Sequence, residues 1–96
     1  MAYYVLLINW TEQGIRNVKE TGNRVSAAEQ LFQKHGAKLG QIFMTMGRYD
    51  YVAISEAPDD ETMTKALLAL GSLGNVRTET MRAYGQDELA GLLAGL

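Results

Sequence analysis

The sequence predicts an α+β protein of the ferredoxin-like type, in which a βαββαβ chain forms a four-stranded antiparallel sheet with helices on one face. Two observations predict this fold. Short runs of β-branched, aromatic and aliphatic residues alternate with segments of helical periodicity, and glycine or proline separates them. Ninety-six residues, 47% hydrophobic and 21% charged, are enough for one domain with a modest core.

The first third of the chain supplies one strand and one interrupted helix. Residues 3–9 predict the first strand, and Thr11 can cap a helical segment that runs to Glu20. Residues 21–23, Thr-Gly-Asn, are expected to interrupt that helix. A second helical stretch ends at Gly36, where a left-handed C-cap is expected, and its periodic positions are Val25, Ala28, Leu31, Phe32 and His35.

The middle of the chain predicts a β-hairpin. Residues 39–46 and 51–56 predict the second and third strands, and Gly47 begins the short turn between them. Four of the five methionines are expected at core positions: Met44, Met46, Met63 and Met81.

The last third predicts a helix, a strand and a helical tail. Pro58 ends the third strand, and residues 59–61, Asp-Asp-Glu, favour the start of a helix whose apolar stripe is Met63, Ala66, Leu67, Leu70 and Leu73. Residues 76–84 predict the fourth strand, whose polar character indicates an edge position. We expect a domain over residues 1–86 and a short helical tail over residues 87–96, with one side lined by Leu89, Leu92, Leu93 and Leu96.

The first strand has apolar residues in both of its registers. Tyr3, Val5 and Leu7 alternate with Tyr4, Leu6 and Ile8, although helices are expected on one face of the sheet only. An uncovered apolar face would be larger than soluble monomers usually expose, so a second copy of the chain is expected to cover it. The tail either clasps that neighbour or is a loosely packed terminus.

Several segments together resemble the GYD domain family. They are residues 47–50, Gly-Arg-Tyr-Asp, the strand 51–54, the stretch 70–78, and the opening strand with residues 8–9, 11 and 13–16. The resemblance spans roughly residues 3–84. It implies a small dimeric α/β barrel and carries over no shared catalytic residue. The turn and residues 74–80 are also similar, with one departure, to the effector-binding domain of leucine-responsive regulators, which implies ligand sensing. The sequence has no counterpart of the DNA-binding domain of those regulators.

Composition argues against several classes of function. The net charge of −2 and the scattered basic residues provide no cationic surface for nucleic acid. The chain has no cysteine, and its N-terminal apolar run is too short for a signal peptide or a membrane span. We therefore expect a cytoplasmic protein without direct nucleic-acid or membrane partners.

The Gly-Arg-Tyr-Asp turn is the one compact motif, and it has two interpretations. In the structural one, Gly47 takes a positive φ and Asp50 accepts backbone N–H groups in the loop. In the functional one, Arg48 and Asp50 fix a polar group while Tyr49 packs against it. Tyr3 and Trp10 are candidates for an aromatic ligand pocket and could equally be core residues.

His35 is the only histidine, and it is either a general base or a favourable charge at a helix C-terminus. One histidine without cysteines cannot form a metal site within one chain, and no phosphate loop or catalytic triad is present, so we expect neither a metal nor a cofactor. The acidic pairs at residues 59–61 and 87–88 precede helices, where they stabilise the N-terminus.

Three functions remain open. The first is an oligomeric accessory protein that holds a small molecule between sheet and helices or at the subunit interface. The second is a cofactor-free enzyme of the monooxygenase or isomerase kind, with tyrosine, Arg48 and His35 as its polar groups. The third is a partner-docking protein that uses residues 89–96 as a helix-in-groove ligand.

Overall fold

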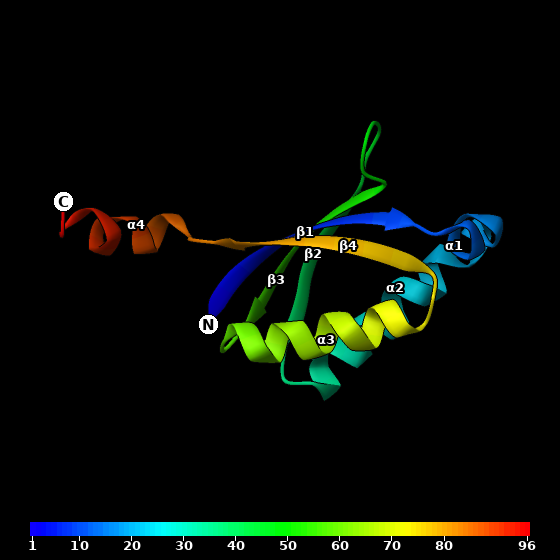
Figure 1. Cartoon of the computed structure of the whole chain (residues 1–96), viewed down its shortest axis with the longest axis horizontal. Helices are drawn as coiled ribbons and strands as arrows, with labels where there is room; N and C mark the ends of the chain where they lie inside the picture. Colours follow the sequence, from blue (N-terminus) through cyan, green and yellow to red (C-terminus); the bar gives the residue numbers. More distant parts are fainter.

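The structure is a computed structural model that describes all 96 residues, and it has the predicted α+β architecture. Its elements are β1 (Ala2–Trp10), α1 (Glu12–Arg16), a short 3₁₀ helix η1 (Val18–Glu20), α2 (Thr21–Lys34), β2 (Lys38–Met44), β3 (Tyr51–Ala57), α3 (Asp60–Ser72), β4 (Val76–Ala83) and α4 (Gln86–Leu93). Helices α2 and α3 lie against one face of the sheet, while α4 extends away from the domain beyond the end of β4 (Figure 1). None of the helices combines the length and the apolar character needed to cross a membrane.

The four strands lie in the order β2-β3-β1-β4, and every neighbouring pair is antiparallel. This confirms the ferredoxin-like topology and the edge position of β4. The other edge strand, β2, has an irregular register between Leu39 and Ile42. Gly40 lies at this irregularity, where a Cβ atom would come within 2.8 Å of the Ile54 carbonyl oxygen, so the close approach of the two strands requires glycine.

The core lies between the sheet and the helices α2 and α3. Tyr4, Leu6 and Ile8 on β1 face it, and Phe32 and Met63 close it from the two helices. The Asp59 side chain accepts a hydrogen bond from the backbone N–H of Thr62 at 2.8 Å, so α3 begins where the acidic cluster predicted. The same hydrogen bond holds the pKa of Asp59 below its usual value.

The opposite face of the sheet has no helix over it (Figure 1). The register places these apolar or aromatic side chains on this open face: Tyr3, Val5, Leu7, Phe43, Val52, Ile54, Met81 and Ala83. Charged side chains surround them: Lys38 on β2 and Arg77 and Glu79 on β4 lie on the edge strands, and Glu56 lies on the inner strand β3 opposite Lys38. The two apolar registers of β1 therefore correspond to a core face and an open face.

Two sequence predictions about local structure were wrong. The break in the first helical region falls at Asn17 and η1, whereas α2 already begins at Thr21. Gly22 does not end the helix, because one glycine costs only about 1 kcal/mol of helix stability relative to alanine. Of the four methionines expected in the core, only Met63 is buried: Met46 lies in the turn after β2 with 98% of its surface exposed, Met81 is on the open face, and Met44 lies at the exposed end of β2.

Candidate functional site

The Gly-Arg-Tyr-Asp turn joins β2 to β3 in a conformation held by two hydrogen bonds from Thr45. Gly47 has a φ of 102°, as the structural interpretation requires. The Thr45 N–H donates to the carbonyl of Asp50 at 2.9 Å, and the Thr45 hydroxyl donates to the carbonyl of Tyr49 at 2.6 Å. These bonds close the turn and present the Tyr49 side chain at the end of the sheet.

Asp50 fastens this turn to the end of β1. Its carboxylate accepts a hydrogen bond from the backbone N–H of Trp10 at 2.9 Å, and its own N–H donates to the Ile8 carbonyl and to the Asn9 side-chain oxygen. The expected partner was a backbone N–H inside the loop. The observed partner belongs to β1, because the start of β3 lies beside the end of β1 in the sheet.

Tyr49 borders a shallow polar hollow of about 370 Å³ at this end of the open face. Its hydroxyl donates to the Glu79 carboxylate at 2.8 Å, and Arg77 and Asn9 also line the hollow. The hydrogen bond to Glu79 raises the pKa of the Tyr49 hydroxyl, and the positive charge of Arg48 acts in the opposite direction.

The six predicted ligand-binding residues divide between the two ends of the sheet. Trp10, Tyr49 and Asp50 lie together, with the exposed Arg48 in the same turn. Tyr3 lies at the opposite end of β1, and its ring is next to Gly85.

His35 also lies away from the turn. It is the C-cap of α2, and Gly36 follows with a φ of 84°, as the sequence predicted. His35 comes before β2 and Arg48 comes after it, and a strand of seven residues spans roughly 23 Å. The two side chains that the enzyme hypothesis combines therefore belong to opposite ends of one protomer. No group of three or more His, Asp or Glu side chains gathers in a way that could hold a metal ion.

A second, mainly apolar cavity lies between the core face of the sheet and helices α2 and α3. Its volume is about 190 Å³, and twelve of its fifteen lining residues are hydrophobic. Trp10 and Tyr51 form one wall, with their ring centroids 5.0 Å apart in an edge-to-face arrangement. Three polar residues from outside β1 and β3 complete the lining: Thr21, Arg24 and Asn75.

The sequence alone did not indicate that these three polar residues line a cavity. Arg24 directly precedes Val25, the first position of the apolar stripe of α2, and that adjacency was the only signal in the sequence. Asn75 belongs to the loop before β4, which α1 approaches closely: the Thr11 N–H donates to the Asn75 carbonyl at 3.1 Å. Neither position could be related to a cavity before the packing of α1 and α2 was known.

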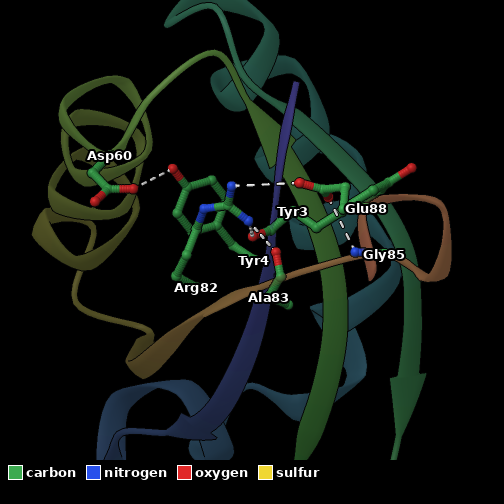
Figure 2. Close-up of polar contacts among 7 residues, drawn as sticks. All are labelled: Tyr3, Tyr4, Asp60, Arg82, Ala83, Gly85 and Glu88. Carbon is green, nitrogen blue, oxygen red and sulfur yellow. Dashed lines mark hydrogen bonds and ion pairs between the residues drawn. The ribbon is translucent and has the colours of Figure 1, made fainter. Parts of the chain in front are cut away.

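A polar cluster at the junction with α4 sets the direction of the tail (Figure 2). The Arg82 side chain lies beside the Tyr4 ring, 5.7 Å from its centroid, and also contacts the Glu88 carboxylate at 3.9 Å. Arg82 donates to the carbonyl of Ala83, and Glu88 accepts from the N–H of Gly85 at 3.1 Å. These contacts connect α4 to β4 and, through Tyr4, to the core.

Tyr4→Phe tests the deepest bond of this cluster. The Tyr4 hydroxyl donates to the Asp60 carboxylate at 2.6 Å, and burial together with this bond raises the Tyr4 pKa to about 12. We expect the substitution to lower the free energy of unfolding by about 1–2 kcal/mol at neutral pH in urea titrations.

The same bond has a defined pH dependence. Because the folded-state pKa is raised, its stabilisation is complete below the ordinary tyrosine pKa of 10.0 and is lost as the pH rises toward about 12. In that window the stability of Tyr4→Phe should fall less steeply than that of the parent chain. Tyr84→Phe is the matched control, because the Tyr84 side chain is exposed and its hydroxyl has no hydrogen-bond partner. Equal alkaline slopes for Tyr4→Phe and the parent chain would refute this assignment.

A family model and a relative of similar length match this chain. The model described as the GYD domain matches residues 4–93. A Thermus thermophilus protein named glutamine synthetase and cystathionine beta-lyase binding protein is 29% identical over 90 residues, which are 93% of this chain and 95% of that protein.

Solved structures share the fold. A crystal structure of a Thermus thermophilus protein has a TM-score of 0.57 at 26% identity, and the match covers 88% of this chain and 95% of that chain. The feast or famine regulatory protein of M. tuberculosis, complexed with L-methionine, has a TM-score of 0.68 at 13% identity, and the match covers 90% of this chain and 52% of that chain. At that identity the regulator shares the fold alone.

Proposed function

This chain belongs to the GYD domain family, and on that premise we propose that it is an accessory protein that forms a homodimer and docks on a metabolic enzyme. The observation that carries the proposal is the Thermus relative, which is named for binding glutamine synthetase and cystathionine beta-lyase. The similarity covers 95% of that relative, so almost no further sequence remains in it to provide a separate enzyme-binding region. Its binding surface then belongs to the part that the two chains share.

Helix α4 is the element best suited to dock on an enzyme. Leu89, Leu92 and Leu93 are about half exposed on it, and their spacing places them on neighbouring turns of one helix. The helix projects from the domain (Figure 1), and the family match extends to its last residue. A short amphipathic helix held away from its own domain has the form of a helix-in-groove ligand, and the occupied groove would be on the enzyme.

The open face of the sheet is assigned to a second copy of the chain. Its centre is apolar and three of its four charged residues lie on the edge strands, which resembles the usual distribution in a protein interface. Lys38 on β2 is opposite Glu56 on β3, and Arg77 and Glu79 lie on β4, so both signs of charge are available for pairing around a two-fold axis. The division of the chain into a domain over residues 1–86 and a tail over residues 87–96 is part of this proposal.

The separation of His35 from Arg48 favours an accessory role over the enzyme hypothesis. A general base must come within hydrogen-bond distance of the proton that it removes, and the other polar group must reach the same substrate. Within one protomer, β2 holds these two side chains apart by about its full length. The tyrosine, Arg48 and His35 arrangement therefore has no geometric support within one chain.

Removal of residues 87–96 should abolish enzyme binding and leave the homodimer intact. The measurement is biolayer interferometry against purified glutamine synthetase and cystathionine β-lyase from the same source, with the oligomer followed by native mass spectrometry. Leu89→Ser with Leu92→Ser should weaken binding by roughly tenfold or more, because apolar anchors dominate helix-in-groove affinity. Leu68→Ser is the matched control, since Leu68 is an exposed leucine on α3.

Two outcomes would contradict this assignment. If the full chain binds neither enzyme, the docking function is wrong. If the truncated chain becomes monomeric, α4 is a clasp between subunits, and the docking role of the helix must be abandoned.

A further inference from the structure

Arg24 is a half-buried cation without an acidic partner. It lies on α2 at the cavity between sheet and helices, and one of its guanidinium nitrogens donates to the carbonyl of Gly14 at 2.9 Å. It takes part in none of the ion pairs, which involve Arg16, Lys65 and Arg82. A guanidinium has five N–H donors, so a single carbonyl leaves most of its hydrogen-bonding capacity free.

The cavity behind Arg24 is apolar and of the size of a small organic molecule. Leu6, Ile8 and Ala28 contribute to its interior, and its volume is about 190 Å³. An apolar cavity of about 150 Å³ can bind benzene. The space is therefore sufficient for one aromatic ring or a short aliphatic chain with one polar group attached.

The other polar groups of the lining can donate hydrogen bonds to an anion, but none of them can form an ion pair with a positive charge. The Tyr51 hydroxyl is 3.4 Å from that of Thr21, and both residues line the cavity with Asn75. Hydroxyl and amide groups can donate hydrogen bonds to an oxyanion. No carboxylate is among the lining residues, so an ammonium group in the ligand would have no ionic partner there.

We propose that this cavity binds a small monocarboxylate, with its aromatic or short aliphatic part among the core side chains and its carboxylate on Arg24. Arginine and a carboxylate can form two parallel N–H···O hydrogen bonds, which fits a guanidinium with free donors. A dicarboxylate or a free amino acid would place a second charge against an apolar wall. The proposal goes beyond enzyme docking and does not depend on it.

Trp10 is a fluorescence probe for ligand binding in this cavity. It is the only tryptophan of the chain, and its ring lines the cavity. Phenylacetate and hexanoate are therefore titrated against the intact chain while the Trp10 fluorescence is followed, with 2-phenylethanol and hexanol as neutral analogues of similar shape. We expect saturable binding of the carboxylates and binding of the alcohols that is weaker by roughly tenfold or more.

Arg24→Gln isolates the ionic contact. It keeps a side chain that can donate to the Gly14 carbonyl but removes the charge, so carboxylate affinity should fall roughly tenfold or more while alcohol affinity stays the same. Arg16→Gln is the control, since Arg16 is an exposed arginine paired with Glu12 on α1. Ala28→Val narrows the cavity and should weaken both ligand classes, with thermal melting used to verify that the variant is folded.

The results separate the proposal from its rivals. Equal affinity for acids and alcohols, unchanged in Arg24→Gln, would mean that the cavity is an unselective apolar void. Failure of phenylacetate and hexanoate to change the Trp10 fluorescence or the melting temperature at millimolar concentration would overturn the site. Neither result would affect enzyme docking, which is measured separately and through α4.

Discussion

Ile54→Lys is expected to convert the proposed homodimer into a monomer that keeps its fold. Ile54 lies on β3, an inner strand of the sheet, and its side chain is on the open face beside Val5. In a two-fold interface the substitution occurs twice, so two ammonium groups would have to be buried without partners. Each such burial costs several kcal/mol, so two unpaired ammonium groups should outweigh the gain from the apolar contacts around them. Native mass spectrometry measures the subunit number, and circular dichroism measures the fold.

Leu68→Lys is the matched control for the interface. Leu68 is a leucine on α3 with 69% of its surface exposed, on the helical side of the sheet, so a lysine there should leave the dimer intact. A parent chain that is monomeric at micromolar concentration would contradict the assignment of the open face to a second copy. A stable Ile54→Lys dimer would place the interface elsewhere on the molecule.

The fold was predictable because its main determinants are local. Alternation along residues 3–9 predicted both faces of β1, and Asp59 and Gly36 predicted a helix start and a helix end that the structure confirms. The prediction that four methionines lie in the core was wrong for a physical reason. Met81 alternates as a core residue would, but alternation alone cannot tell which face of a sheet the helices cover.

The candidate site was less predictable because it depends on how distant segments pack. Asp50 could be recognised as a turn residue, but its bond to Trp10 requires the pairing of β1 with β3. His35 and Arg48 were considered together only as polar groups, and the length of β2 separates them. Arg24 belongs to no sequence motif. It is a candidate ligand-binding residue only because it lines the cavity that α2 forms against the sheet.

Gly14→Ala is expected to be the most damaging single-methyl change in the chain. Gly14 is buried on α1, where a Cβ atom would overlap the carbonyl oxygen of Asn75. The neighbouring bonds hold this contact tightly, since the Thr11 hydroxyl donates to the Gly74 carbonyl at 2.6 Å. Backbone must therefore move, and we expect a loss of about 3 kcal/mol or more, seen as a fall in melting temperature of about 12 °C or more.

Gly22→Ala, at a second helical glycine, is the matched control for Gly14→Ala. Gly22 lies in the first turn of α2, and a Cβ there would have no atom within 4 Å. Gly22→Ala should leave the melting temperature unchanged or raise it slightly, because alanine loses less backbone entropy on folding. Since the two substitutions add the same methyl group, their difference isolates the contact between α1 and the loop before β4. Equal melting temperatures for both variants would show that this contact yields easily, and that the close approach of Gly14 to Asn75 does not fix α1 against the loop before β4.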